Sequence, residues 1–309
     1  MNIICDKSKL LEGINISLKA IPGKSTMAIL ECMVIEAKDG MIKLISNDLE
    51  IGIETIIEGD IKEPGSVAVN AKVFFEIIRK LPYNEVSITV NENFTMNISC
   101  GKAKFNIPVK DTEEFPYLPT VIKDKSVLIS QFTLKEVIRQ TVFSISDNEN
   151  TKVMTGELFE IQGSQLKVVS LDGHRISIRK IELKQSYDDV SVIIPGKTLI
   201  EISKILNGGL DDEICMYFTD KHVLFEFDNT IVLSRLIEGD YSECLWIADG
   251  ICEDRGASRA CRGVLAESGE ICAVEDIVAE DECHWPVPYE LPSDEESLCD
   301  SVGGGLCRV

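Results

Sequence analysis

The first 241 residues of the chain contain one sequence pattern twice, about 124 positions apart. The motif Leu10-x-Glu12-x-Ile14 recurs as Leu134-x-Glu136-x-Ile138, and Lys43-x-x-Ser46-x-Asp48 recurs as Lys167-x-x-Ser170-x-Asp172. A longer motif, Val69 to Leu81, recurs one position later as Ile194 to Leu206. This period exceeds the roughly 20–50 residues of solenoid repeats. The sequence therefore predicts two copies of one domain, which favours a pseudo-symmetric assembly over a single catalytic pocket.

Each copy is predicted to be an α+β domain with two helices on a predominantly antiparallel sheet. Within a copy the order strand, helix, strand, strand, strand (βαβββ) occurs twice. Apolar residues at helical spacing predict helices over 10–18, 71–81, 133–144 and 197–206. Pro22-Gly23 and Pro82 end the two helices of the first copy, because proline cannot continue a helix.

Alternating apolar residues and turn signals predict the strands. In the first copy the predicted strands cover residues 2–5, 26–37, 41–46, 51–57, 66–70, 86–90, 94–100 and 104–109. Asp39-Gly40 is a strong hairpin signal. In the second copy, turns are expected at Gln162-Gly163-Ser164 and Thr219-Asp220-Lys221. The predicted domains are 1–119 and 126–241, joined by a proline-containing linker over 111–125.

Basic residues occur on the predicted helices, although the chain as a whole is acidic. It carries 31 Lys and Arg against 52 Asp and Glu, a formal net charge of −21. The helical basic residues are Lys7, Lys9, Lys19, Lys72, Arg79, Lys80, Lys135, Arg139, Lys197 and Lys204. If the helices share one face, that face attracts phosphate by charge without reading bases. The alternative is that these are ordinary solvated helix surfaces.

The sequence predicts a cytoplasmic protein that uses no metal or cofactor. Asp6 and Lys7 follow the first strand at once, so no apolar core of a secretory signal is expected. No run approaches the roughly 18 apolar residues that span a bilayer. The cysteines of the repeated part are Cys5, Cys32, Cys100 and Cys215. Because they are scattered, we expect them to be reduced core residues.

Motifs in both copies together resemble the bacterial DNA polymerase III beta subunit, the sliding clamp. The first copy contains Met27-Ala28-Ile29-Leu30, Asp39-Gly40, Ser46-Asn47-Asp48-Leu49-Glu50, Glu63-Pro64-Gly65 leading to Ala71-Lys72-Val73-Phe74-Phe75-Glu76, and Glu114-Phe115-Pro116. The second contains Asp172-Gly173-His174-Arg175, Ile193-Ile194-Pro195-x-Lys197 and Ser234-Arg235-Leu236-Ile237-Glu238-Gly239. Their order and spacing carry the resemblance, which covers about three quarters of the chain.

The resemblance implies tandem DNA-clamp domains and a processivity factor in DNA replication. In this family three similar domains form a subunit, and two subunits close head to tail into a ring whose helices line the hole. Double-stranded DNA threads the hole without sequence preference. The replicative polymerase, the clamp loader and repair proteins bind through short peptide motifs. The clamp is non-catalytic, although the family is catalogued with DNA-directed DNA polymerases, which are nucleotidyltransferases.

The resemblance also implies two sets of site residues. The DNA-binding candidates are Lys24, Lys72, Arg79 and Lys197, together with the helical cations Lys135, Arg139 and Lys204. The second-domain wall of the peptide cleft is expected at Met154, Leu171, Gly173, His174, Arg175 and Ile176. Such a cleft buries a few apolar side chains of an extended peptide. Without the resemblance, residues 172–175 predict only a tight turn with solvated charges.

Residues 242–309 depart from the family. They contain no Lys, Asn, Thr or Phe, but seven of the eleven cysteines. Those cysteines lack the close pairs typical of zinc sites. Our hypothesis is that the segment is translated out of the family's reading frame and is largely disordered. The third clamp domain is then missing, so closure of the usual ring becomes doubtful and the clamp is expected to be incomplete.

Two other functions remain open at this point. Three two-domain chains would also supply six domains, which predicts a trimeric ring. A different class is a hydrolase that uses Asp172 and His174 as an acid/base pair. No nucleophile motif or glycine-rich phosphate loop supports the hydrolase.

Overall fold

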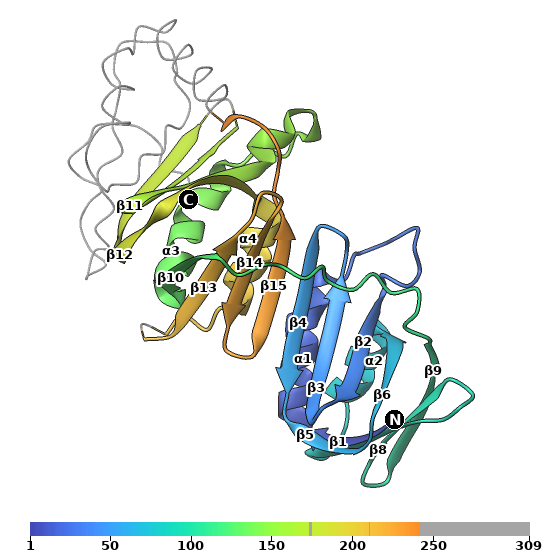
Figure 1. The fold of residues 1–309 in the computed structure, drawn as a ribbon. Helices are drawn as coiled ribbons and strands as arrows, with labels where there is room; N and C mark the ends of the chain where they lie inside the picture. Colours follow the sequence, from blue (N-terminus) through green and yellow to red (C-terminus); the bar gives the residue numbers. More distant parts are fainter. Residues whose placement is uncertain (173–174, 210, 242–309) are drawn as a thin grey trace, which may run out of the picture.

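The two sequence repeats fold into two modules of the same architecture. The structure is a computed structural model, and it describes residues 1–172, 175–209 and 211–241. In each module two α-helices cover one face of antiparallel strands, as the sequence predicts (Figure 1). The expectations for residues 242–309 lie outside the described residues.

The elements of the first module follow the predicted order with one additional strand. In the second module two long strands occupy the region between the helices where four separate strands are predicted. The first module contains β1 (Asn2–Asp6), α1 (Lys7–Ser17), η1 (Leu18–Ala20), β2 (Cys32–Lys38), β3 (Met41–Asn47), β4 (Ile51–Ile57), β5 (Gly59–Glu63), β6 (Gly65–Asn70), α2 (Ala71–Arg79), β7 (Glu85–Val90), β8 (Thr95–Cys100) and β9 (Ala103–Lys110). The second contains β10 (Lys125–Ser130), α3 (Gln131–Thr141), η2 (Val142–Ser144), η3 (Glu149–Thr155), β11 (Gly156–Leu171), β12 (Ile176–Pro195), α4 (Gly196–Ile205), β13 (Glu213–Phe218), β14 (His222–Phe227) and β15 (Thr230–Arg235).

Short polar side chains begin three of the four described helices. The side chains of Asp6, Asn70 and Ser130 accept hydrogen bonds from backbone N–H groups in the first turns of α1, α2 and α3. These caps satisfy donors that have no partner inside a helix. Helix α4 instead follows Pro195 and has no side-chain cap. All four predicted helices are confirmed.

The register of the strands repeats between the modules. Strand β2 pairs with β6 from Cys32↔Asn70, and β11 pairs with β12 from Gly156↔Pro195, at the equivalent residues. Likewise, Asn47↔Gly52 of β3 and β4 corresponds to Leu171↔Ile176. The expected turn near Gly163 lies within β11, where the register with β12 shifts and Gly163 has φ +58°. The two modules therefore share strand pairing at equivalent residues, although β11 and β12 run continuously where the first module has separate strands.

One strand prediction was wrong in the first module, and one strand was missed. Residues 26–31 do not extend β2, because Leu30 N–H bonds to Met27 O and Cys32 N–H bonds to Ile29 O, which forms turns. The short strand β5, which pairs with β1, was not predicted. Its residues are mostly exposed and lack alternating apolar side chains, which are the signal on which strand prediction depends.

The modules are joined by direct strand pairing. Strand β15 pairs with β4 from Thr230↔Thr55 to Ser234↔Ile51, which links both modules into one sheet of 13 described strands. The Thr55 and Thr230 hydroxyl oxygens lie 2.8 Å apart across this junction. Ala20, Ile51 and Ile53 of the first module belong to the core of the second. The junction is thus part of the hydrophobic core and fixes how the modules sit together.

Candidate nucleic-acid face and peptide-binding cluster

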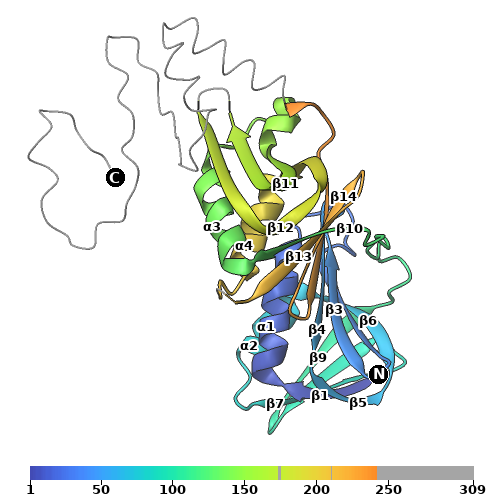
Figure 2. The same ribbon diagram turned by 60° about the vertical axis from the view of Figure 1, so that its left-hand side comes forward.

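The four described α-helices lie on the same side of the joined sheet (Figure 2). Helix α1 packs beside α2, and α3 beside α4. Lys19, just after α1, forms an ion pair with Glu201 of α4 (3.9 Å), so the helices also meet across the junction. We call this surface, formed by α1 to α4, the helix face. The sequence left open whether the helices share one face, and the structure shows that the four described α-helices do.

The four helices align with one another when they are counted from the residue before the first turn. Four positions after Asp6, Asn70, Ser130 and Pro195 stand buried apolar residues: Leu10, Phe74, Leu134 and Leu199. Six positions after stand glutamates: Glu12, Glu76, Glu136 and Glu201. Nine positions after stand Asn15, Arg79, Arg139 and Lys204. The sequence prediction missed this fourfold pattern, because α1 and α2 share too few residues to align without their caps.

In three helices the glutamate forms an ion pair with the basic residue three positions later. The N–O distances are 2.9 Å for Arg79–Glu76, 2.7 Å for Arg139–Glu136 and 2.7 Å for Lys204–Glu201. The hydrogen bond from Arg79 lowers the pKa of Glu76, and the bond from Arg139 lowers the pKa of Glu136. The cations lie in the last helical turn, where the helix dipole favours positive charge. Three of the seven predicted DNA-binding residues are therefore internally paired.

The other four predicted DNA-binding residues differ in their surroundings. Lys24 is exposed in the loop before β2. Lys72 donates a hydrogen bond to the carbonyl oxygen of Gly23, the residue before Lys24 (3.1 Å). Lys135 donates to Leu206 O (2.9 Å), which follows α4. Lys197 forms a 2.6 Å ion pair with Asp48 of the first module.

The Lys197–Asp48 pair is a contact between modules. Burial lowers the pKa of Lys197, but the hydrogen bond and charge of Asp48 together with the charges of Glu50 and Glu201 outweigh burial, and the net pKa is raised. The Asp48 side chain is only 6% exposed and also accepts backbone hydrogen bonds from Glu50 and Ile51. Lys197 therefore stabilises the junction in addition to lying at the start of α4.

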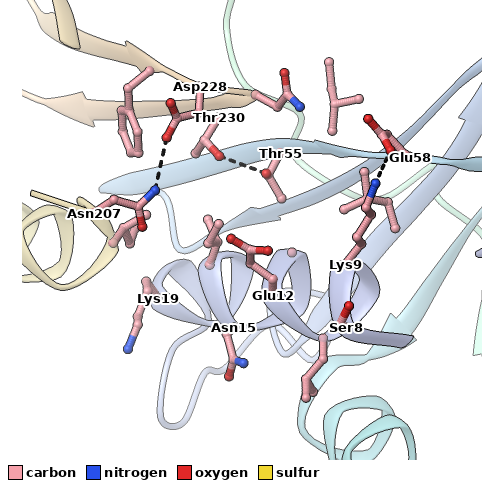
Figure 3. A pocket seen from close by; sticks show the side chains of 18 of the residues that line it. Ser8, Lys9, Glu12, Asn15, Lys19, Thr55, Glu58, Asn207, Asp228 and Thr230 are labelled. Atoms are coloured by element: carbon pink, nitrogen blue, oxygen red, sulfur yellow. Dashed lines mark hydrogen bonds and ion pairs between the residues drawn. The ribbon is translucent and has the colours of Figure 1, made fainter. Parts of the chain in front are cut away.

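A groove of about 610 Å³ lies on the helix face at the junction (Figure 3). One side is formed by α1, including Glu12 and Asn15, and the other by β4, the end of α4 and the β14–β15 turn. Charges of both signs line it, and Lys9 is bonded to Glu58. Asn207 donates to Asp228 at 3.5 Å. The groove is polar and of mixed charge, and the paired cation Lys204 is one of its lining residues.

The predicted peptide-cleft residues that the structure describes surround one apolar cluster. Met154 and Leu171 are buried in it, and Ile176 packs against it. The cluster lies on the face of β11 and β12 opposite the helices, because Leu158 belongs to it while its neighbour Phe159 belongs to the helix-side core. Gly173 and His174 lie outside the described residues.

The sequence prediction missed further members of this cluster: Leu158, Val169, Ile178, Ile193, Ile237 and Tyr241. The Tyr241 hydroxyl donates to Gly156 O and accepts from Leu171 N–H, each at 3.2 Å. At the cluster edge, the Arg175 guanidinium bonds to Asp172 (2.9 Å) and lies 6.0 Å from the Phe143 ring. Phe143 is 41% exposed, so apolar surface is available beside the cluster.

Asp172, proposed in the hydrolase alternative, is engaged in the turn. Its carboxylate accepts hydrogen bonds from the backbone and side chain of Arg175. Within the described ranges no group of three or more His, Cys, Asp or Glu side chains is placed to hold a metal. No helix in these ranges is long and apolar enough to cross a membrane.

Comparison with known families gives two adjacent matches. Residues 1–119 match the DNA polymerase III beta subunit, N-terminal domain, and residues 128–243 match the central domain of the same subunit. The first matched range corresponds to the first module and the second range to the second module. They end close to residue 241, after which the composition changes.

Individual relatives agree with the family match. The chain is 36% identical over 252 residues to a beta sliding clamp of Halalkalibacterium halodurans and 35% identical over 252 residues to that of Bacillus subtilis. It spans 66% of the length of each, with 78% and 79% of its own residues. A solved structure of a putative DNA polymerase III beta subunit from Eubacterium rectale is 58% identical (TM-score 0.77), and the Bacillus subtilis clamp is 34% identical (TM-score 0.76). Each alignment covers 78% of this chain and 66% of the other.

Proposed function

The chain belongs to the DNA polymerase III beta subunit family, and on this premise we propose that it is a non-catalytic clamp component that holds double-stranded DNA against its helix face. The observation that carries the proposal is the collection of α1 to α4, with their basic residues, on one side of a sheet that spans both modules. Because charge attracts phosphate without reading bases, binding is expected to be independent of sequence.

Lys24, Lys72, Arg79, Lys135, Arg139, Lys197 and Lys204 are the proposed DNA contacts. The proposal includes tethering of the replicative polymerase to DNA. The chain spans 66% of the length of these two relatives, and its assembly into a ring is part of the proposal. The β15–β4 pairing illustrates how one module joins the next in such an assembly.

Fluorescence anisotropy with a 30-base-pair duplex tests the DNA contacts. The full chain with Lys72, Arg79, Arg139 and Lys204 changed to Ala is compared with a control in which exposed strand and turn residues Lys102, Lys104, Lys110 and Lys221 are changed to Ala. Both variants lose four positive charges. The helix variant is expected to bind more weakly and to show a shallower salt dependence, by roughly 0.9 per lost phosphate contact in the log–log slope. Equal behaviour of the two variants would refute the proposal.

We further propose that the apolar cluster around Met154, Leu171 and Ile176 binds short peptide motifs of the polymerase, the clamp loader and repair proteins. The partly buried Ile176 and the exposed Phe143 ring supply apolar contact area at its edge. Fluorescence polarisation with a labelled clamp-binding peptide of the polymerase tests this. Ile176→Asp is expected to abolish binding, whereas Ile122→Asp, at a linker residue 70% exposed, should not change it. Loss of binding in both variants, or in neither, contradicts the assignment.

A further inference from the structure

Three cations of the helix face must give up an ion pair before they can bind a phosphate. Arg79, Arg139 and Lys204 each bond to a glutamate one turn earlier in the same helix. This ion pair of glutamate and cation lies at the same position in α2, α3 and α4, with the cation in the last turn of each helix. Glu201 also lies 3.9 Å from Lys19, and Glu76 lies 3.3 Å from Lys80, so two of the carboxylates each serve two cations.

In every one of these pairs the cation is more exposed than the carboxylate. The exposed fractions are 53% for Arg79 and 46% for Glu76, 66% for Arg139 and 33% for Glu136, and 50% for Lys204 and 21% for Glu201. The cation is therefore the more accessible partner of each pair, by a small margin for Arg79 and a larger one for Arg139 and Lys204. Exposed pairs of this kind are weak, so a phosphate can displace the carboxylate from its cation.

We propose that Glu76, Glu136 and Glu201 are built-in competitors for the DNA backbone phosphate. Each carboxylate forms an ion pair with its cation when phosphate is absent, and the ion pair forms again when the phosphate dissociates. This inference rests on the proposed function, in which the helix face meets duplex DNA. The contact with each phosphate is then weak and quickly exchanged, because release of DNA does not leave an unpaired cation. Such exchange lets a duplex move along the helix face while it stays held.

The arrangement also limits how tightly the face binds. Once a phosphate has displaced the carboxylate, two like charges remain near one cation, and their repulsion works against the complex. Glutamine in place of glutamate keeps the shape and removes that repulsion. A change of Glu to Gln should therefore strengthen DNA binding by about twofold per site, the size of one helix ion pair.

The test uses the full chain with E76Q, E136Q and E201Q combined, and anisotropy of a 30-base-pair duplex at a salt concentration where the wild type is half saturated. The matched control combines E92Q, E113Q and E114Q, which are exposed glutamates outside the helices. Both variants raise the net charge by three. We expect the helix variant to bind on the order of tenfold more tightly, the product of three sites, and the control to bind less than twofold more tightly. Urea unfolding of both variants verifies that the fold is intact.

The outcomes separate the competitor role from the DNA contact itself. If the helix glutamine variant binds no more tightly than the control while the lysine and arginine variant described above loses binding, the competitor role is wrong and the DNA face stands. If neither set of helix substitutions alters binding relative to its control, the proposed function fails as well. Weaker binding by the glutamine variant would show that the glutamates position the cations instead, and would also overturn the inference.

Discussion

The two modules differ most at one position of their shared core. In the first module Met33 on β2 is fully buried among apolar residues, whereas the equivalent position on β11 holds Glu157, which is also fully buried. The residues around them correspond as well: Ser17 ends α1 where Thr141 ends α3. The same fold thus accepts a thioether in one copy and a carboxyl group in the other.

The hydrogen bonds around Glu157 explain how the second module tolerates it. The Thr141 hydroxyl oxygen lies 2.8 Å from Val137 O and 2.8 Å from a Glu157 carboxyl oxygen, but it has only one hydrogen to donate. Both contacts are satisfied if Glu157 is protonated and donates to Thr141. Burial raises the pKa of Glu157 to about 8 even when Thr141 donates to the carboxylate, a hydrogen bond that by itself lowers the pKa.

The backbones of the two modules are pseudo-symmetric, but their buried titratable groups are not. Position 33 of the first module carries no titratable group, while position 157 of the second couples folding to pH. Glu157 directly precedes Leu158 of the apolar cluster at the start of β11, so their side chains lie on opposite faces of the strand. A change at this position therefore affects the strand that supports the proposed peptide site.

The largest expected effect tests whether the modules unfold separately. Phe74 and Leu199 occupy the same position of α2 and α4, and both are fully buried. Phe74→Ala should lower the free energy of unfolding by about 3–5 kcal/mol, and Leu199→Ala by about 2–5 kcal/mol, because each leaves a cavity. Since the second module's core includes residues of the first, both should shift one common urea transition. Val73→Ala, at an exposed position of α2, is the control and should change stability by less than about 0.5 kcal/mol. Two separate transitions would show that the junction does not couple the modules.

The next effect follows from the pKa of Glu157. From about pH 4.5 to 8 the unfolded carboxyl loses the proton that the folded one keeps, so stability falls as pH rises through this window. The loss is about 1.4 kcal/mol per pH unit. Glu157→Gln cannot ionise, and its amide can donate to Thr141. In urea unfolding at pH 5, 6, 7 and 8, the free energy of unfolding of the variant relative to that of the wild type should increase with rising pH.

Glu92→Gln, at an exposed turn residue, is the control for this pH series. Its stability should run parallel to that of the wild type at every pH. Parallel curves for Glu157→Gln and the wild type would mean that Glu157 is already ionised in the folded protein, and the contrast between the modules would then disappear.

The smallest expected effect concerns the ion pair between the modules. Asp48→Asn keeps an oxygen for the backbone hydrogen bonds but removes the charge that pairs with Lys197. We expect a loss of about 1 kcal/mol, because Asp48 is buried while Lys197 is more than half exposed. The difference should shrink at high salt. Lys184→Ala, which breaks the exposed pair with Glu213, should cost less. An equal loss for both variants would mean that the junction pair is an ordinary surface pair.

Local patterns predicted most elements because apolar periodicity and proline stops act over short distances. They place the four helices within a few residues of their bounds, although the caps Asp6, Asn70 and Ser130 were not recognised as start signals. Strand β5 escaped prediction because it contains little apolar alternation. Met154, Leu171 and Ile176 were found through family resemblance alone, and Tyr241 was missed because its two hydrogen bonds join residues 70 and 85 positions away.

The sequence by itself determined the duplication, the helices with their basic residues, and the family. The tertiary structure alone decided that these helices share one face, that Lys197 contacts Asp48, and that Glu157 lies buried where its twin is Met33. These features depend on contacts between distant segments, such as the Thr55–Thr230 contact across 175 positions. Periodicity indicates which face of a helix or strand is apolar. Only the packing of all elements determines which residues that face contacts.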